Sequence, residues 1–176
     1  MSALRAIGIA GSITTPSRSG ALVEEVLSRL ATHGVETEMI DLTTLSADGL
    51  LWRAKDAGVT SALERVTGVP MLVIGTPVYR ASYTGQLKAF FDLLPRDALA
   101  GSSVGCIATG AGQTHALVID HGLRPLVASL AGLTAAHTIY ATDVDLGGYP
   151  KDPLPEMFDE PLTALVEELV RLASRT

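Results

Sequence analysis

The sequence predicts a doubly wound α/β fold with a mostly parallel sheet and right-handed crossovers. Five apolar runs of strand length alternate with segments whose apolar residues recur at helical spacing. The run at 69–75 is apolar throughout, which is typical of a parallel strand buried on both faces. Apolar residues make up 47% of the chain and aromatic residues only 5%, so Ala, Val, Leu and Ile must fill the core. With 176 residues, the chain has the length of one domain, spanning 1–176.

The strands and helices are expected to alternate along the whole chain. We expect strands at 4–10, 35–42, 69–75, 104–108 and 134–141. Apolar residues three and four positions apart indicate helices at 22–30, 61–66, 87–94, 115–130 and 162–172. Pro95 ends the third of these helices, and residues 142–156, which contain Gly-Gly and three prolines, are expected to form a loop. Cys106 and His137 fall in the fourth and fifth strands, where Cys106 is expected to be a small buried residue.

Charge and cysteine content exclude several classes of protein. The net charge is −6 and no two basic residues are adjacent, so the basic surface of a nucleic-acid-binding protein is absent. Cys106 is the single cysteine, which excludes an intramolecular disulfide and a cysteine-based metal site. No His, Asp and Glu pattern has metal-ligand spacing, so we expect no metal. We find neither a signal peptide nor a membrane span and therefore expect a cytoplasmic protein.

Three segments at the expected carboxyl ends of strands are candidates for a ligand site, because ligands of doubly wound sheets bind there. Loop one, residues 11–20, contains five hydroxyl side chains and Arg18 just before a helix. Helix N–H groups, short hydroxyls and a guanidinium together favour an anion. The segment matches neither the nucleoside-triphosphate nor the dinucleotide fingerprint, so a single terminal phosphate fits best. The alternative is plain helix N-capping by Thr15 or Ser17.

The other two segments differ in chemistry from loop one. Loop two, residues 75–85, follows the apolar third strand with a proline and holds two of the four tyrosines, Tyr79 and Tyr83. Loop three, residues 109–114, is rich in glycine and small side chains, against which a flat molecule can lie. Together the three loops suit flavin mononucleotide (FMN), which has one phosphate, a ribityl chain and a planar ring. The alternative for loop two is an ordinary strand–helix connection with surface tyrosines.

At these loops the chain resembles a known family. The segment GTPVYRASYTGQLK at 75–88, continued by DLLP at 92–95, resembles the signature of NAD(P)H-dependent FMN reductases of flavodoxin-like fold. Gly-Ser at 11–12, PSRS at 16–19 and Thr-Gly at 109–110 also fit. The resemblance is strongest to the reductase partners of two-component alkanesulfonate and methanesulfonate monooxygenases. It implies a three-layer α/β sandwich around a five-stranded parallel sheet of order 2-1-3-4-5, with helices on both faces.

The resemblance also implies roles for particular residues. The FMN phosphate would be held by Ser12, Ser17, Arg18 and Ser19. The isoalloxazine ring would lie along Pro77, Val78, Tyr79 and Arg80, in a site further shaped by Tyr83 and Gly85. On its other side it would be flanked by Thr109, Gly110 and Gly112. Relatives often carry an arginine shortly after the Gly-Ser pair, where this chain has Ile13 and Thr14, so Arg18 is the only cation in loop one.

Pro125 predicts an interruption of the helix at 115–130. Proline cannot donate a hydrogen bond to the carbonyl of residue 121, and its ring crowds that carbonyl. A one-residue bulge with π-helical bonding relieves the clash and re-aims His121. The resemblance independently implies a π-helix at a tetramer interface near the flavin, with His121 at the inserted position. The alternative is an exposed histidine beside a simple proline kink.

These observations lead to three functional hypotheses. In the first, NADPH or NADH reduces FMN, and FMNH₂ passes to a separate flavin-dependent monooxygenase; no catalytic acid or base is expected, because hydride moves between cofactors. The second is a flavodoxin-like electron carrier, although carriers stack large aromatic residues on the ring and Trp52 lies outside the three loops. The third is a quinone, azo-dye or chromate reductase with bound FMN. Only 18% of residues are charged, which together with the interrupted helix favours a homotetramer or homodimer.

Overall fold

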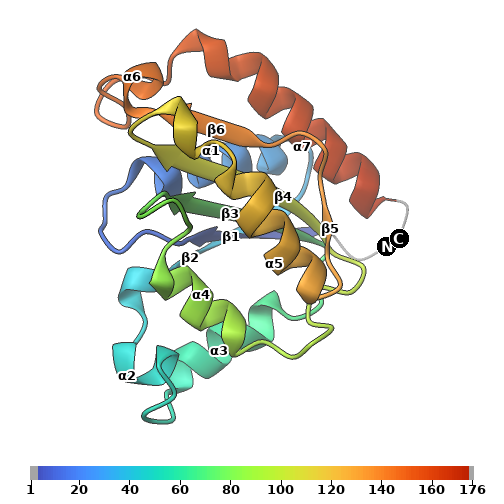
Figure 1. The fold of residues 1–176 in the computed structure, drawn as a ribbon. Helices are drawn as coiled ribbons and strands as arrows, with labels where there is room; N and C mark the ends of the chain where they lie inside the picture. Colours follow the sequence, from blue (N-terminus) through green and yellow to red (C-terminus); the bar gives the residue numbers. More distant parts are fainter. Residues whose placement is uncertain (1–3, 175–176) are drawn as a thin grey trace.

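The computed structural model describes residues 4–174 and arranges them as a parallel sheet between two helical layers (Figure 1). The strands are β1 (Arg5–Ala10), β2 (Glu36–Asp41), β3 (Met71–Pro77), β4 (Ser103–Gly110), β5 (Leu133–Thr134) and β6 (Ile139–Thr142). Their order is β2-β1-β3-β4-β5, with β6 also paired to β4, and every pair is parallel. This is the flavodoxin-like order, so the predicted fold class is confirmed.

The helices of the described chain are short apart from the first and the last. They are α1 (Arg18–Thr32), α2 (Ala47–Leu50), α3 (Ala57–Val66), α4 (Gly85–Asp92), α5 (Arg124–Ser129), α6 (Asp143–Leu146) and α7 (Asp159–Ala173). Single 3₁₀ turns occupy Leu42–Thr44, Gln113–His115 and Glu156–Phe158, and Ile119–Leu123 forms a π-helical turn. Every helix in this part of the chain is too short or too polar to cross a membrane.

Two apolar clusters, one on each face of the sheet, form the core. On β1, Ile7 and Ile9 pack with α3, α4 and α5, while Ala6 packs with α1 and α7. On β3, Leu72 belongs to the first of these clusters and Met71 to the second. Side chains of a strand alternate between faces, so a strand covered by helices on both sides must be apolar at every position. The apolar runs of the sequence therefore mark the central strands correctly.

Short polar side chains fix where the helices begin. Ser17 accepts the backbone N–H of Gly20 at 3.0 Å and caps α1, as one interpretation of loop one expected. Asp56 accepts the N–H of Val59 at 2.8 Å, so α3 begins at Ala57 rather than at residue 61. The caps place the start of α1 at the carboxyl end of β1.

Three predicted elements differ from the structure in more than the position of their ends. The expected fifth strand at 134–141 is broken into β5 and β6, and His137 lies in the break. The expected helix at 115–130 is a 3₁₀ turn, a π-helical turn and α5 in succession, and the expected loop at 142–156 contains one helical turn, α6. The predicted π-helix is confirmed: it contains His121, which is exposed, and Pro125 follows in the first turn of α5. Cys106 is buried in β4, as expected.

Candidate functional site

A cavity of about 490 Å³ lies at the carboxyl edge of the sheet, where the three loops meet. It includes nine of the thirteen residues predicted to bind a cofactor: Ser12, Ser17, Arg18, Ser19, Pro77, Val78, Tyr79, Thr109 and Gly110. Thr14, Pro16, Ala111 and Asp143 complete the lining. The predicted juxtaposition of the loops is therefore confirmed, whereas Arg80, Tyr83, Gly85 and Gly112 do not line this cavity. We call it the main cavity below.

The first turn of α1 presents hydroxyl groups to the main cavity. Ser19 Oγ is buried and has no hydrogen-bond partner among the described residues. Ser12, also buried, accepts the backbone N–H of Thr14 at 3.2 Å. A buried hydroxyl without a partner is unfavourable, and an anionic oxygen at a helix N-terminus would supply the missing acceptor. These residues fit a phosphate group.

The guanidinium of Arg18 connects this turn to the segment after β6. Its Nη1 donates to Asp143 Oδ1 at 2.6 Å, its Nη2 to the carbonyl of Gly147 at 2.9 Å, and its Nε to the carbonyl of Tyr149 at 3.2 Å. A guanidinium carries five N–H groups, so two remain for a ligand. Asp143 is a residue of the main cavity that the sequence did not predict. The one feature that could have indicated it is its position directly after the last strand.

Loop two is a tight turn fastened to loop three. The backbone groups of Tyr79 and Ser82 exchange hydrogen bonds of 2.9 and 3.2 Å, and Arg80 and Ala81 at the tip have φ values of 52° and 64°. Both residues of such a turn require positive φ, which is uncommon outside glycine. The N–H of Val78 donates to the carbonyl of Thr109 at 2.7 Å. Val78 and Tyr79 therefore border the main cavity, while Arg80 is exposed at the tip.

A side-chain hydrogen bond connects the end of loop two to loop one. Buried Thr84 caps α4 by accepting the N–H of Leu87 at 3.1 Å, and its hydroxyl donates to the carbonyl of Gly11. Tyr83 is half-buried, and its ring lies 3.1 Å from the place where a Cβ on Gly122 would stand. Tyr83 thus faces the π-helical turn rather than the main cavity.

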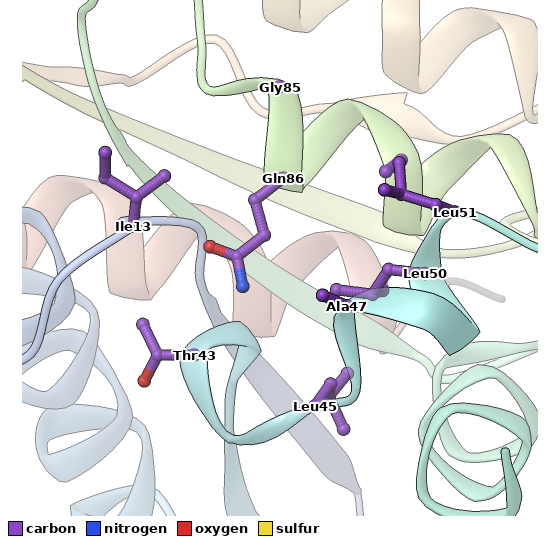
Figure 2. A pocket seen from close by; sticks show the side chains of 9 residues that line it. Ile13, Thr43, Leu45, Ala47, Leu50, Leu51, Gly85 and Gln86 are labelled. Carbon is purple, nitrogen blue, oxygen red and sulfur yellow. The ribbon is translucent and has the colours of Figure 1, made fainter. Parts of the chain in front are cut away.

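Gly85 borders a second cavity, of about 400 Å³, on the other side of loop one (Figure 2). Figure 2 shows Gln86 between Ile13 of loop one and the short helix α2. The Gln86 side chain donates to the carbonyl of Leu42, and most of the other lining residues are apolar: Ile13, Leu45, Ala47, Leu50, Leu51 and Ala89. Leu51 is 56% exposed at its edge. This groove is apolar and lacks the charged groups of the main cavity.

Loop three is positioned by Tyr140 of β6. The Tyr140 hydroxyl donates to the carbonyl of Gly112 at 2.6 Å. Burial and the nearby carboxylates of Asp143 and Asp145 raise the pKa of Tyr140, so the phenol stays protonated and remains a donor. A Cβ on Gly110 would lie 2.5 Å from the Tyr140 hydroxyl oxygen, whereas a Cβ on Gly112 would meet nothing within 4 Å. Packing against Tyr140 therefore explains why residue 110 is a glycine, whereas no contact among the described residues explains the glycine at 112.

His121 and His115 share a third cavity, of about 260 Å³, between the tip of loop two and the π-helical turn. Ser82 and Thr114 also line it. No group of three or more His, Cys, Asp or Glu side chains within residues 4–174 lies close enough to hold a metal ion. The π-helical turn thus borders the site without belonging to the main cavity.

Comparison with known proteins identifies the family. A model of the NADPH-dependent FMN reductases matches residues 4–146, a range that includes all three loops. The chain belongs to this family of FMN reductases. It is similar to the NADH-dependent FMN reductase SfnE of Pseudomonas putida, with 37% identity over 150 residues that cover 83% of this chain and 81% of the relative.

A second relative and a solved structure extend the comparison. The FMN reductase (NADPH) of Escherichia coli (strain K12) is 34% identical over 151 residues, covering 85% of this chain and 79% of the relative. The apo form of the NADH:FMN oxidoreductase EMOB has a TM-score of 0.83 at 26% identity, covering 98% of this chain and 89% of that chain. These names include both NADH and NADPH, so membership of the family does not decide which nucleotide is preferred.

The chain is accordingly an NAD(P)H-dependent FMN reductase, an oxidoreductase that uses FMN and a reduced nicotinamide nucleotide. When bound, FMN would supply the hydride-accepting chemistry and the nicotinamide nucleotide the hydride, because such cofactors carry this chemistry themselves. Among the described residues around the main cavity, the ionisable side chains are Arg18, Tyr79 and Asp143. The chain would therefore contribute binding and orientation: the hydroxyls and Arg18 fit a phosphate, and loops two and three border the space beside them.

Proposed function

We propose that this FMN reductase exchanges its flavin and passes FMNH₂ to a separate monooxygenase that acts on a sulfonate or a related sulfur compound. One observation carries the proposal: Tyr79 is the only aromatic residue among the described residues lining the main cavity, and it is itself 46% exposed. Carriers that keep their flavin stack large aromatic side chains on the ring. Trp52, the single tryptophan, is 80% exposed and lies beyond α2. A flavin ring with so little aromatic cover can leave the protein and be replaced by another flavin molecule.

Within this proposal each loop has a task. The phosphate is bound by Ser12, Ser17, Arg18 and Ser19; the Ser17 oxygen already accepts a backbone N–H, and its hydroxyl proton is available to the phosphate. The ring is bordered by Pro77, Val78, Tyr79 and Arg80, with Tyr83 and Gly85 supporting loop two from behind. The opposite side is formed by Thr109, Gly110 and Gly112, where small residues admit a flat ring. We propose that the whole chain acts as one flavin-binding domain.

Steady-state oxidation of NADPH and NADH, followed at 340 nm, tests the reductase step. We expect turnover with FMN to exceed turnover with FAD, because one terminal phosphate fits the first turn of α1 and a dinucleotide does not. Riboflavin should require a higher concentration than FMN, because it lacks the phosphate. Equal efficiency with all three flavins contradicts the proposed phosphate site.

Two measurements test the transfer step. Reductase mixed in air with a flavin-dependent sulfonate monooxygenase, its sulfonate substrate, the nicotinamide nucleotide and FMN should release sulfite, and omission of FMN should abolish release. Gel filtration of reductase mixed with FMN should separate a colourless protein from free flavin. Yellow protein that keeps its flavin supports instead a carrier or a quinone, azo-dye or chromate reductase with resident FMN.

We also propose that the protein is a homotetramer or a homodimer in the cytoplasm, where its reduced nicotinamide substrate is found. Ile13 and Leu51 beside the apolar groove of Figure 2, and Leu117 beside the π-helical turn, are each more than half exposed, at 56%, 56% and 59%. Their burial against another copy would stabilise an assembly. Light scattering coupled to gel filtration measures the mass directly, and a monomer at tens of micromolar contradicts the proposal. Deletion of His121 should weaken the assembly or increase flavin retention.

A further inference from the structure

The main cavity contains one positive and one negative side chain, and they are paired with each other. Among the described lining residues, Arg18 is the only cation and Asp143 the only carboxylate. The distance between Arg18 Nη1 and Asp143 Oδ1 is 2.6 Å. The formal charges of the lining therefore sum to zero, although the first turn of α1 otherwise has the features of an anion site.

We propose that Asp143 sets the affinity of the site for phosphate-bearing flavins by competing with the phosphate for Arg18, and so keeps FMN exchangeable. The inference rests on the proposed binding of the FMN phosphate at Arg18 and Ser19. A phosphate monoester carries close to two negative charges at neutral pH. Placed against Arg18, it would lie near the Asp143 carboxylate, and the repulsion between these like charges would weaken its binding.

The position of Arg18 does not depend on Asp143 alone. The carbonyls of Gly147 and Tyr149 accept from Nη2 and Nε at 2.9 and 3.2 Å. These two hydrogen bonds hold the guanidinium in place when the charge at residue 143 changes. Asp143→Asn retains an oxygen that can accept from Nη1 and removes only the negative charge. This substitution therefore separates the charge of residue 143 from its hydrogen bond.

The expected size of the effect follows from exposure. The Asp143 side chain is 55% exposed and that of Arg18 is 35% exposed, so solvent and salt reduce the repulsion. We expect Asp143→Asn to bind FMN about ten-fold more tightly at low ionic strength, and the gain to shrink as salt is added. Riboflavin has no phosphate, so its affinity should stay unchanged.

Asp159 provides a matched control. Its Oδ1 accepts from Arg29 Nη2 at 2.7 Å, so it also pairs with an arginine of α1. Arg29 follows Arg18 by eleven residues, which places it about 16 Å further along the helix. Asp159→Asn therefore removes the same charge from the same kind of ion pair, away from the cavity. Its affinities for FMN and riboflavin should equal those of the wild type.

The experiment measures dissociation constants for FMN and riboflavin by flavin fluorescence, with wild type, Asp143→Asn, Asp143→Ala and Asp159→Asn at low and high salt. Tighter FMN binding in both variants at residue 143, with riboflavin unchanged, supports the inference. Unchanged or weaker FMN binding in Asp143→Asn overturns it and identifies Asp143 as a residue that merely positions Arg18. A wild type that binds FMN no more tightly than riboflavin overturns the phosphate site itself, and the inference with it.

Discussion

Glu168 of α7 holds the backbone at His137, where the last part of the sheet is interrupted. Its Oε2 accepts the backbone N–H of His137 at 2.9 Å and lies 2.8 Å from the ring Nδ1. Its Oε1 accepts the N–H of Ala136 at 3.0 Å. From the other side, Arg124 donates to the carbonyls of Ala135 and Ala136, each at 3.1 Å. These bonds replace the ladder bonds that the backbone loses between β5 and β6.

Replacement of Glu168 should destabilise the protein. Glu168→Ala leaves two backbone N–H groups without their charged acceptor, and we expect a loss of about 2 kcal/mol in the free energy of unfolding. Urea unfolding followed by circular dichroism measures it. Glu167→Ala, at the exposed neighbouring position on α7, is the matched control and should change stability by less than about 0.5 kcal/mol. Equal stability of both variants contradicts a structural role for Glu168.

The same carboxylate predicts a loss of stability in acid. Burial raises the pKa of Glu168, but hydrogen bonds from the backbone of His137 and Ala136 and from the His137 ring outweigh it, so the pKa lies below its ordinary value of 4.5. A carboxylate with a lowered pKa in the folded state contributes stability above the unfolded pKa and loses it as pH falls through the folded pKa. The stability difference between wild type and Glu168→Gln should therefore shrink below pH 4.5. A difference that is constant down to about pH 3 contradicts this.

Ser19 should affect ligand binding and not folding. Its buried hydroxyl has no partner among the described residues, so Ser19→Ala should leave stability unchanged or slightly raised. FMN should bind about ten-fold more weakly, with riboflavin unaffected, because one hydrogen bond to the phosphate is lost. Ser17→Ala is the contrasting variant: it removes the cap of α1 and should lower stability by about 1 kcal/mol. If Ser19→Ala instead destabilises the protein and leaves FMN binding intact, Ser19 has no role in the phosphate site.

Two glycines of loop three should respond differently to alanine. A Cβ on Gly112 meets open space, so Gly112→Ala should fold with wild-type stability and weaken FMN binding about ten-fold by obstructing the ring. A Cβ on Gly110 would stand 2.5 Å from Tyr140 Oη, so Gly110→Ala should lose about 2 kcal/mol of stability. Thermal unfolding and flavin fluorescence separate the two effects. Unchanged FMN affinity in Gly112→Ala contradicts the placement of the ring beside loop three.

Cys106 should be inert in the folded protein. Burial raises the pKa of its thiol to about 12, in spite of the opposing charge of Arg124, so almost no thiolate exists at neutral pH. A reagent that reacts with thiols by disulfide exchange, at about pH 8, should react negligibly with the native protein. After unfolding it should react with one thiol per chain. Rapid labelling of the native protein contradicts the burial of β4.

Features that depend on neighbouring residues can be predicted from the amino-acid sequence alone. Continuous apolar runs identify the strands because both faces of a parallel sheet are covered. Pro125 predicts the π-helical turn at Ile119–Leu123 because a missing N–H and a crowded ring act on residues one turn away. The hydroxyl-rich and glycine-rich loops at the strand ends can also be recognised from neighbouring residues, because each directly follows an apolar run. Nine of their predicted cofactor-binding residues line one cavity.

Contacts between residues far apart in the chain become visible in the folded protein alone. Glu168 accepts the N–H of His137, in the break of the fifth strand, from 31 positions away, and Arg18 pairs with Asp143 across 125 positions. The sequence between 134 and 141 predicts a continuous strand, because nothing in these residues indicates that a carboxylate of α7 accepts their backbone N–H groups. Likewise, the hydroxyls and guanidinium of loop one indicate an anion site, but its charge balance depends on a carboxylate that the packing of β6 beside β4 brings to it. Local chemistry therefore indicates the candidate site, and long-range packing determines the charge balance of the cavity.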